Sequence, residues 1–286
     1  MNADQVVHLN GELLPLADAK ISVLDRGFIY GDGVYEVVPV YGRKPFRLRE
    51  HLARLQRSLD GIRLANPHGA DEWARLIDAL VAGQPCDDQA VYLQVTRGVA
   101  KRDHAFPAGV TPTVFMMSNP LVLPTREQVE RGVAVVTAED NRWHRCDLKT
   151  TSLLGNVLMR QLAADQGAAE TVMFRDGFLT EASASNVLVV RGGHVLAPPK
   201  DHLILPGITY DATQEFAERA GVPFEIRPVS RDEALTADEM WLSSSTKEVL
   251  AVTTLDGRPF AGGVPGPVFR RVHAEFQAVK RSLQAA

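Results

Sequence analysis

The chain has 286 residues, of which 45% are hydrophobic and 23% charged, proportions typical of a soluble globular protein with one large or two ordinary domains. Its formal net charge is −4, so it lacks the basic surplus that nucleic-acid binding requires. Two cysteines, Cys86 and Cys146, are too few for a disulfide framework. We find no signal-peptide pattern and no apolar run of membrane-spanning length, and we expect a cytoplasmic protein with no nucleic-acid and no membrane partner.

The first part of the chain mixes helices and strands. Residues 49–64 place leucines and an isoleucine at helical spacing, and residues 71–82 repeat the pattern between an acidic start and a glycine. Residues 89–98 alternate apolar and polar side chains, which predicts a strand, and 114–117 predict another. Two prolines interrupt the run 118–128, so we predict a linker there.

The second part begins with a predicted strand at 133–138, followed by a helix after Lys149. Further signals, in chain order, predict hairpins at 176–177 and 192–193, a helix from Pro206 to near Gly221, a capping box of Ser230 and Glu233, a hairpin at 256–257, and a final helix carrying Phe269, Val272, Phe276, Val279 and Leu283. This irregular mixture predicts an α+β fold. We expect a small N-terminal domain at 1–119, a linker at 120–131 and a larger C-terminal domain at 132–286.

Common nucleotide and metal motifs are missing. Gly31-Asp-Gly33 begins like a dinucleotide-binding loop, but Glu36 stands where the third glycine belongs. There is no P-loop and no HExxH motif. His51 and His104 lie far along the chain from both cysteines, so the sequence predicts no metal site.

The stretch CDLKTTSLLGN, residues 146–156, places one lysine, Lys149, among leucines and hydroxyl side chains. The ordinary interpretation is a surface lysine with its ammonium group in water. However, no carboxylate follows Asp147 until Asp165. Partial withdrawal from water favours the neutral form of a lysine, and a neutral amine can attack a carbonyl. Lys149 is therefore a candidate nucleophile, which spacing alone does not prove.

Glu181 is the second candidate. It lies in FLTEASASNVLVV, residues 178–190, where small residues follow the carboxylate. A solvent-exposed glutamate at a hairpin edge is the ordinary interpretation. The small residues would also let a flat, bulky group approach, and Asn186 and the serines could orient a buried carboxylate.

Two further stretches have the character of phosphate sites. In LPGITYDAT, residues 205–213, Gly207 permits close backbone approach, and Ile208 and Thr209 begin a helix whose free N–H groups can bind an anion. The alternative is an ordinary helix start with Thr209 as its cap. The hydroxyl run SSST, residues 243–246, is either a second phosphate-binding loop or a polar turn.

Four cationic or titratable side chains crowd the loop TRGVAKRDHAFP, residues 96–107: Arg97, Lys101, Arg102 and His104. A solvated basic loop is the ordinary interpretation. In a chain of negative net charge, the same cluster could bind a carboxylate.

Six segments, taken in order, resemble the fold-type IV enzymes that use pyridoxal 5'-phosphate (PLP), and among them the D-amino-acid aminotransferases. The segments are DRGFIYGDGVYEVV, QVTRGVAKRDHAFP, RWHRCDLKTTSLLGNV, LTEASASNV, LILPGIT and SSSTKE. The resemblance runs from about residue 7 to the final helix. Each motif alone is modest evidence, whereas six in the same order are strong.

The resemblance implies a role for each candidate. Lys149 would be the Schiff-base lysine and proton carrier, Glu181 would pair with the pyridine nitrogen, and Arg54 would bind the phosphate. The other cofactor contacts would be Leu205 on one face of the ring and, around the phosphate, Ile208, Thr209, Ser244 and Ser245.

The implied activity is transamination of D-amino acids with 2-oxo acids by a ping-pong mechanism, as from D-alanine and 2-oxoglutarate to pyruvate and D-glutamate. The substrate carboxylate would be bound by Tyr35, Arg102 and His104. The last two would come from the neighbouring subunit, which implies a homodimer with its active site at the subunit interface.

The sequence departs from the family pattern in small ways. Ala184 stands where relatives often have serine, Ser245 replaces threonine, and residues 150–152 are altered. Within the fold the alternatives are a branched-chain L-amino-acid aminotransferase, an R-selective amine transaminase and aminodeoxychorismate lyase. A non-catalytic binding protein is the alternative from another class.

Overall fold

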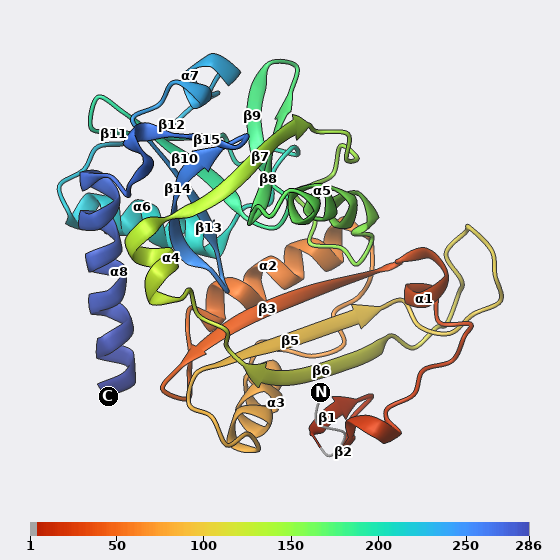
Figure 1. Ribbon diagram of the computed structural model, residues 1–286. Coiled ribbons are helices and arrows are strands. Elements are labelled where there is room, and N and C mark those ends of the chain that lie inside the picture. The colour runs from red at the N-terminus through yellow and green to blue at the C-terminus, as the bar shows by residue number, and fades with distance from the viewer. Residues whose placement is uncertain (1–4, 286) are drawn as a thin grey trace. The chain divides into compact units, whose positions relative to one another are not determined.

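The computed structural model describes residues 5–285, and the chain divides into two compact units, which we describe separately (Figure 1). Unit 1 contains the residues up to Leu121, the segment Leu148–Leu153 and the last turn of the final helix, Leu283–Ala285. Unit 2 contains Val122–Asp147 and Leu154–Ser282. The domain limits expected above stay a prediction.

Unit 1 is built on an antiparallel sheet of strand order β2-β1-β6-β5-β3-β4. Its elements are β1 (Val6–Leu9), β2 (Glu12–Pro15), η1 (Leu16–Asp18), α1 (Arg26–Tyr30), β3 (Gly33–Tyr41), β4 (Lys44–Pro45), α2 (Leu48–Gly61), α3 (Ala70–Ala82), β5 (Gln89–Thr96) and β6 (Thr113–Pro120). The predicted helices at 49–64 and 71–82 and the strands at 89–98 and 114–117 are confirmed as α2, α3, β5 and β6.

One face of this sheet carries the core of unit 1. Val34 faces Val95 and Val38 faces Val91 in the register of β3 with β5, so alternate residues point the same way. The leucine stripe of α2 and the apolar side of α3, including Trp73, pack onto that face (Figure 1). The helical periodicity in the sequence therefore reports a buried stripe.

The segment Leu148–Leu153 lies along the start of β3. The N–H of Tyr35 donates to the carbonyl of Lys149 at 2.9 Å, and the N–H of Thr151 donates to the carbonyl of Gly33 at 3.0 Å. Gly61 ends α2 where a Cβ atom would meet Cδ2 of Leu148 at 2.3 Å, so glycine makes room for the segment. These bonds hold residues 149–151 in an extended segment, and the helix expected after Lys149 begins only at Leu154.

Unit 2 contains a mixed sheet of order β12-β11-β10-β13-β14-β7-β8-β9, with β15 paired to β14. Its strands are β7 (Val133–Glu139), β8 (Glu170–Arg175), β9 (Phe178–Ala182), β10 (Asn186–Arg191), β11 (His194–Ala197), β12 (Phe224–Ile226), β13 (Glu239–Ser244), β14 (Glu248–Leu255) and β15 (Arg258–Pro259). Its helices are α4 (Arg126–Arg131), α5 (Leu154–Asp165), α6 (Ile208–Arg219), α7 (Arg231–Leu235), η2 (Ala261–Gly263) and α8 (Pro267–Ala285).

The local signals of unit 2 are confirmed. The three predicted hairpins are β8–β9, β10–β11 and β14–β15. The capping box is present at the start of α7, where Ser230 and Glu233 exchange bonds with each other's backbone N–H. Both units combine helices with sheets, as the α+β prediction requires.

Regular elements reach into both ends of the run 118–128, and the boundary between the two units lies in it, at Leu121 and Val122. Residues up to Pro120 belong to β6, and α4 begins at Arg126 behind a capping box made by Thr125 and Gln128. Only 121–125 lie outside regular elements. Across residues 5–285, no helix combines the length and apolarity needed to cross a bilayer, and no three His, Cys, Asp or Glu side chains are grouped to hold a metal.

Candidate functional site

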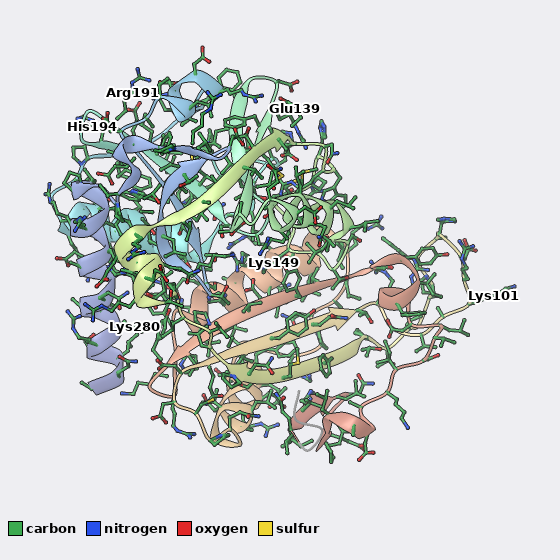
Figure 2. The ribbon with its side chains drawn as sticks, viewed as in Figure 1. Lys101, Glu139, Lys149, Arg191, His194 and Lys280 are labelled. Carbon is green, nitrogen blue, oxygen red and sulfur yellow. The ribbon has the colours of Figure 1, made fainter. Side chains whose placement is uncertain are left out.

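Lys149 is fixed by its backbone at the edge of β3 (Figure 2). Its N–H donates to the hydroxyl of Ser58 at 3.1 Å, and its Nζ atom lies 4.2 Å from the centre of the Tyr35 ring. The side chain is half-buried, and no residue in the described range 5–285 forms an ion pair with it. The ordinary interpretation, a lysine among charges in water, does not describe these surroundings.

A buried polar triad lies between β3 and α2, on the face of the sheet that carries the core of unit 1. Arg54 donates from Nε and Nη2 to the two carboxylate oxygens of Glu36, at 2.8 and 2.9 Å, and Nδ1 of His51 is 2.8 Å from the same carboxylate. Burial works to raise the pKa of Glu36, but the Arg54 guanidinium and His51 more than offset it and hold that pKa well below its usual range. Arg54 is 3% exposed, so it is not a surface arginine. The two bonds to Glu36 fix the plane of the Arg54 guanidinium.

His51 completes the triad as a neutral group. Burial is the main cause that lowers its pKa; the bond and charge of Glu36 oppose this shift, and the charges of Arg54 and Lys149 add to it. A neutral imidazole that donates from Nδ1 to Glu36 leaves Nε2 as an acceptor. Lys149 is close enough for its charge to act on this ring, so the triad and the lysine form one electrostatic group.

The basic loop after β5 is anchored at its base. Nη1 of Arg26 donates to the carbonyl of Asp103 at 2.6 Å, and the guanidinium of Arg97 lies 3.7 Å from the centre of the Phe106 ring. Asp32 binds both arginines at 2.8 Å. Lys101 projects from the tip of this loop (Figure 2).

The two predicted substrate ligands of this loop both lie close to the ring of Tyr30. The guanidinium of Arg102 is 5.5 Å from the centre of the Tyr30 ring, and the His104 ring is 5.4 Å from it. Both side chains are exposed. In the part of the chain that the structure describes, no hydrogen bond joins either of them to Tyr35, and their role as substrate ligands stays a prediction.

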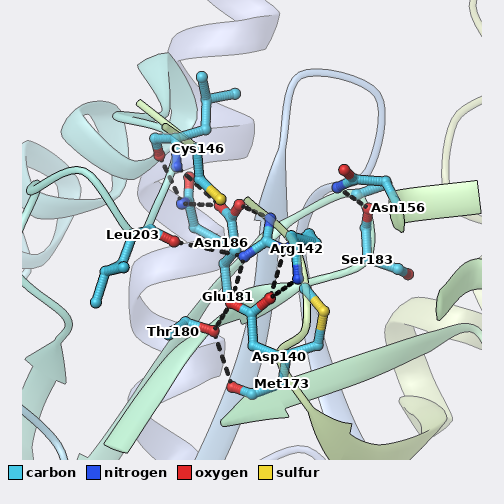
Figure 3. A network of polar contacts seen from close by, with 12 residues as sticks. Asp140, Arg142, Cys146, Asn156, Met173, Thr180, Glu181, Ser183, Asn186 and Leu203 are labelled. Atoms are coloured by element: carbon cyan, nitrogen blue, oxygen red, sulfur yellow. Dashed lines mark hydrogen bonds and ion pairs between the residues drawn. The ribbon is translucent and has the colours of Figure 1, made fainter. Parts of the chain in front are cut away.

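Glu181 is buried in unit 2, which overturns the solvent-exposed alternative (Figure 3). Its Oε1 atom accepts from Nη1 of Arg142. Its Oε2 atom accepts from the N–H of Leu205 at 3.0 Å and from the side-chain amide of Asn186 at 3.3 Å. Burial raises the pKa of Glu181, and the Arg142 guanidinium opposes that shift. Three donors therefore hold one carboxylate at a defined position.

Arg142 is itself held by a second carboxylate. It donates from Nε and Nη2 to the two oxygens of Asp140, at 2.9 and 2.8 Å. Burial acts to raise the pKa of Asp140, yet the bonds from Arg142 outweigh it, and that pKa is lowered. Breaking a buried ion pair by removing one partner costs about 3–5 kcal/mol, so Arg142 stabilises Glu181 and Asp140 together.

The serines after Glu181 have a different partner from the one expected. Ser183 donates to Glu170 at 3.0 Å, and Ser185 also donates to Glu170. The expectation that these serines orient Glu181 is therefore wrong. The part of that expectation that concerns Asn186 is confirmed by its bond to Oε2.

The predicted phosphate residues gather around the start of α6. Gly207 is the N-cap residue and contributes no side-chain cap, so the alternative role of Thr209 as cap is wrong. A Cβ atom at Gly207 would lie 2.0 Å from Oδ1 of Asn186, so a larger residue would displace the Asn186 side chain that binds Glu181. The hydroxyls of Thr213 in α6 and Ser243 in β13 are 3.4 Å apart, which places the end of β13 beside α6. Ser244 is the last residue of that strand.

Apart from Arg102 and His104, which lie beside Tyr30, the predicted site residues form two groups. Unit 1 brings together Tyr35, Arg54 and Lys149 around the start of β3. Unit 2 brings together the residues around Glu181 and the start of α6: Glu181, Leu205, Ile208, Thr209, Ser244 and Ser245.

Four charged or titratable residues of these groups were not predicted as site residues: Glu36, His51, Arg142 and Glu170. Some signal for them exists in the sequence. His51 and Arg54 are three residues apart on a helix, so they share a face beside its buried leucines. Glu36 occupies an inward position of an alternating strand. Arg142 and Glu170 carry no such local signal.

Comparison with known proteins agrees with this arrangement. Residues 33–255 match the family described as amino-transferase class IV. The D-alanine aminotransferase of Bacillus licheniformis is 39% identical over 95% of this chain and 95% of its own. That of Staphylococcus aureus is 38% identical over 95% of this chain and 96% of its own.

Solved structures give the same fold. A branched-chain amino acid aminotransferase of Escherichia coli superposes with a TM-score of 0.91 at 26% identity, covering 97% of this chain and 95% of that one. A fold IV-transaminase of Curtobacterium pusillum gives a TM-score of 0.79 at 27% identity, covering 96% and 92%. The fold-type IV resemblance is confirmed.

Proposed function

The chain belongs to the class IV aminotransferase family, and on that premise we propose that it transfers amino groups between D-amino acids and 2-oxo acids, with PLP as its cofactor. The position of Lys149 carries the proposal. Its side chain is half-buried and forms no ion pair among residues 5–285, so its amine is suited to attack a carbonyl. Names of relatives at 35–39% identity support the choice of D-amino acids.

The side chains present fit PLP. Glu181 offers a buried carboxylate for a protonated ring nitrogen, and the half-buried Leu205 offers an apolar contact for the ring. For a phosphate, Ile208 and Thr209 offer backbone N–H groups at an uncapped helix start, and Ser244 and Ser245 offer hydroxyls. We assign Arg54 to the same phosphate as its cationic ligand.

The proposed chemistry divides between cofactor and protein. PLP, when bound, supplies an electron sink for the charge left by removal of the substrate Cα proton. Lys149 supplies the amine that holds the cofactor and then carries that proton. Glu181 keeps a proton at the ring nitrogen, and Arg142 keeps Glu181 in place as a carboxylate.

Arg54 provides the first test. Replacing Arg54 with alanine removes the cationic phosphate ligand, and we expect the protein to lose PLP on dialysis and to regain part of its activity when PLP is added. Absorbance of the dialysed protein measures the retained cofactor. Arg57→Ala, on the exposed side of the same helix, is the matched control. Equal retention in the two variants would contradict the assignment.

We propose that substrate selection depends on a homodimer. Large apolar side chains are exposed in both units: Val23, Leu24 and Phe28 in unit 1, and Leu154, Val157 and Leu158 in α5 of unit 2. Contact with a second copy would cover such surface. In that dimer Tyr35 of one subunit and Arg102 and His104 of the other bind the substrate carboxylate.

The location is proposed to be cytoplasmic, in keeping with two free cysteines.

Arg102 provides the second test. Arg102→Ala should raise the KM for D-alanine by about tenfold to a hundredfold, because a carboxylate loses a charge-assisted partner, while the cofactor spectrum stays unchanged. Lys101→Ala, at the tip of the same loop, is the control. An unchanged KM would return Arg102 to the role of a solvated loop residue.

Mixing Lys149→Ala, which lacks turnover, with Arg102→Ala, which has a raised KM, and assaying at low D-alanine concentration tests which subunit's site Arg102 serves. A dimer of one Lys149→Ala subunit and one Arg102→Ala subunit has a single site with both residues intact only if Arg102 acts on the neighbouring subunit. Recovery of D-alanine turnover after subunit exchange is the expected result. No recovery, in a mixture shown to contain mixed dimers, would place Arg102 at its own subunit's site or at none.

A second candidate function is transamination of branched-chain amino acids. It is favoured by the structural likeness to the Escherichia coli enzyme of that name. The higher sequence identity to D-alanine aminotransferases leads us to place it second.

A further inference from the structure

Glu170, the first residue of β8, is a fully buried carboxylate that the proposed chemistry does not use. Four donors converge on it. Ser183 and the N–H of Ala184 bind Oε2, at 3.0 and 2.6 Å. Ser185 and the ammonium group of Lys247 bind Oε1, the latter at 2.7 Å. Every donor comes from one of two loops of unit 2.

The first of these loops is the turn 183–185, which connects β9 to β10. It follows Glu181 directly, and its own bonds hold it firmly: the N–H of Ala182 donates to the carbonyl of Ser185 at 2.7 Å, and Asn156 in α5 donates to the carbonyl of Ser183 at 2.9 Å. A shift of this turn would move the end of the strand that carries Glu181.

The second loop is the turn 245–247, which connects β13 to β14. The N–H of Lys247 donates to the hydroxyl of Ser244 at 3.3 Å, while its side chain extends to Glu170. Lys247 therefore links Ser244 and the turn 245–247 to Glu170, the carboxylate that holds the turn 183–185.

A buried carboxylate with four donors constrains both loops strongly. Ser183 and Ser185 are buried and Lys247 is half-buried, so loss of the acceptor leaves several polar groups without a partner. A neutral amide at this position would accept through one oxygen only and would present an N–H2 group to the remaining donors.

We propose that Glu170 is a positioning residue that fixes the spacing between Glu181 and the phosphate turn at Ser244 and Ser245, with Lys247 as the link to that turn. This inference rests on the proposed function, because it assigns the ring nitrogen to Glu181 and the phosphate to the turn. Neither Glu170 nor Lys247 is assigned a contact with the cofactor. Glu170 and Lys247 instead affect whether PLP can contact Glu181 through its ring and the turn at Ser244 and Ser245 through its phosphate at the same time.

The test compares PLP with pyridoxal, which has the same ring but no phosphate. Apoprotein is prepared from the unmodified chain, Glu170→Gln, Lys247→Met and the double variant, and both dissociation constants are measured by absorbance titration. We expect Glu170→Gln to weaken PLP about tenfold to a hundredfold, the range found when outer partners of metal ligands are removed, and to weaken pyridoxal much less. The 31P resonance of bound PLP should shift as well.

Lys247→Met should give the same selective loss, and the double variant should be no weaker than Glu170→Gln alone, because both changes break one link. Arg231→Met, which removes the exposed partner of Glu139 elsewhere in unit 2, is the control for loss of a cation. If Glu170→Gln does not fold, Lys247→Met still tests the inference. The Lys247 side chain is partly exposed, so we expect this variant to fold, and its ratio of PLP to pyridoxal affinity must fall.

Three results would overturn the inference. An unchanged affinity ratio in Lys247→Met would show that the link does not act on the phosphate turn. Additive losses in the double variant would indicate that Lys247 binds phosphate directly. If the unmodified apoprotein binds PLP and all variants bind it equally, only this inference fails, whereas failure of the unmodified apoprotein to bind PLP removes the proposed function as well.

Discussion

Replacing Lys149 with alanine is expected to lower turnover of D-alanine by a factor on the order of 10⁴ or more, because one side chain both holds the cofactor and moves the proton. Lys149 lies 4.2 Å from the Tyr35 ring and is fixed by backbone bonds to Ser58 and Tyr35. Removing its side chain leaves this backbone in place. The variant should therefore fold normally, which circular dichroism and thermal melting would verify, and lose catalysis alone.

Borohydride reduction identifies the residue independently of rate. The purified unmodified protein should be yellow, and reduction followed by peptide mapping should place the cofactor on Lys149. Lys101→Ala is the matched control and should be labelled like the unmodified protein. A reduced adduct on any other lysine would show that the assignment is wrong.

Replacing Glu181 with glutamine is expected to have the second largest effect, a loss of about 10²–10³ in turnover with much of the PLP binding retained. The amide preserves size and can still bind Asn186 and Leu205, but it removes the negative charge opposite the ring nitrogen. That charge matters most where electrons accumulate on the ring in the transition state. Steady-state kinetics and a PLP titration on the same samples separate the two effects.

Glu139→Gln is the control for this substitution, because Glu139 is an exposed glutamate at the end of β7 (Figure 2). It should leave turnover unchanged. A near-normal rate in Glu181→Gln would mean that the buried carboxylate serves stability only. A complete loss of PLP would mean that it serves binding more than rate.

Elements with local signals could be predicted from the sequence. The helix expected at 49–64 is α2, Leu48–Gly61, because its apolar stripe reports the face that packs on the sheet. The capping box at Ser230 is present because both of its bonds join residues three apart. Such features depend on neighbours in the chain and are visible without the fold.

The run 118–128 contains the boundary between the two units and also a local signal that was not used. Pro120 is the last residue of β6, where a missing N–H is tolerated. Thr125 and Gln128 form the same capping-box spacing as at Ser230, so a helix start could have been predicted there. Prolines alone suggested a linker because both lie just outside a regular element or at its end.

The buried charges could not be predicted in the same way. Glu36 and Arg54 are 18 residues apart, and Arg142 and Glu181 are 39 apart. A charged residue is buried only when the fold brings a partner to it, and that partner is not visible in the local pattern. Resemblance alone supplied Arg54, and the stretch around Glu181 had already made that residue a candidate, whereas the carboxylate that holds Arg54 and the arginine that holds Glu181 emerged from the structure.

The most direct test of the proposed function is the choice of substrate enantiomer. Purified protein with PLP and 2-oxoglutarate is given D-alanine or L-leucine at equal concentration, and the initial rate and the handedness of the glutamate formed are measured by chiral chromatography. We predict faster turnover of D-alanine, with pyruvate and D-glutamate as products. Faster turnover of L-leucine, or formation of L-glutamate, would contradict the proposal and favour the branched-chain activity.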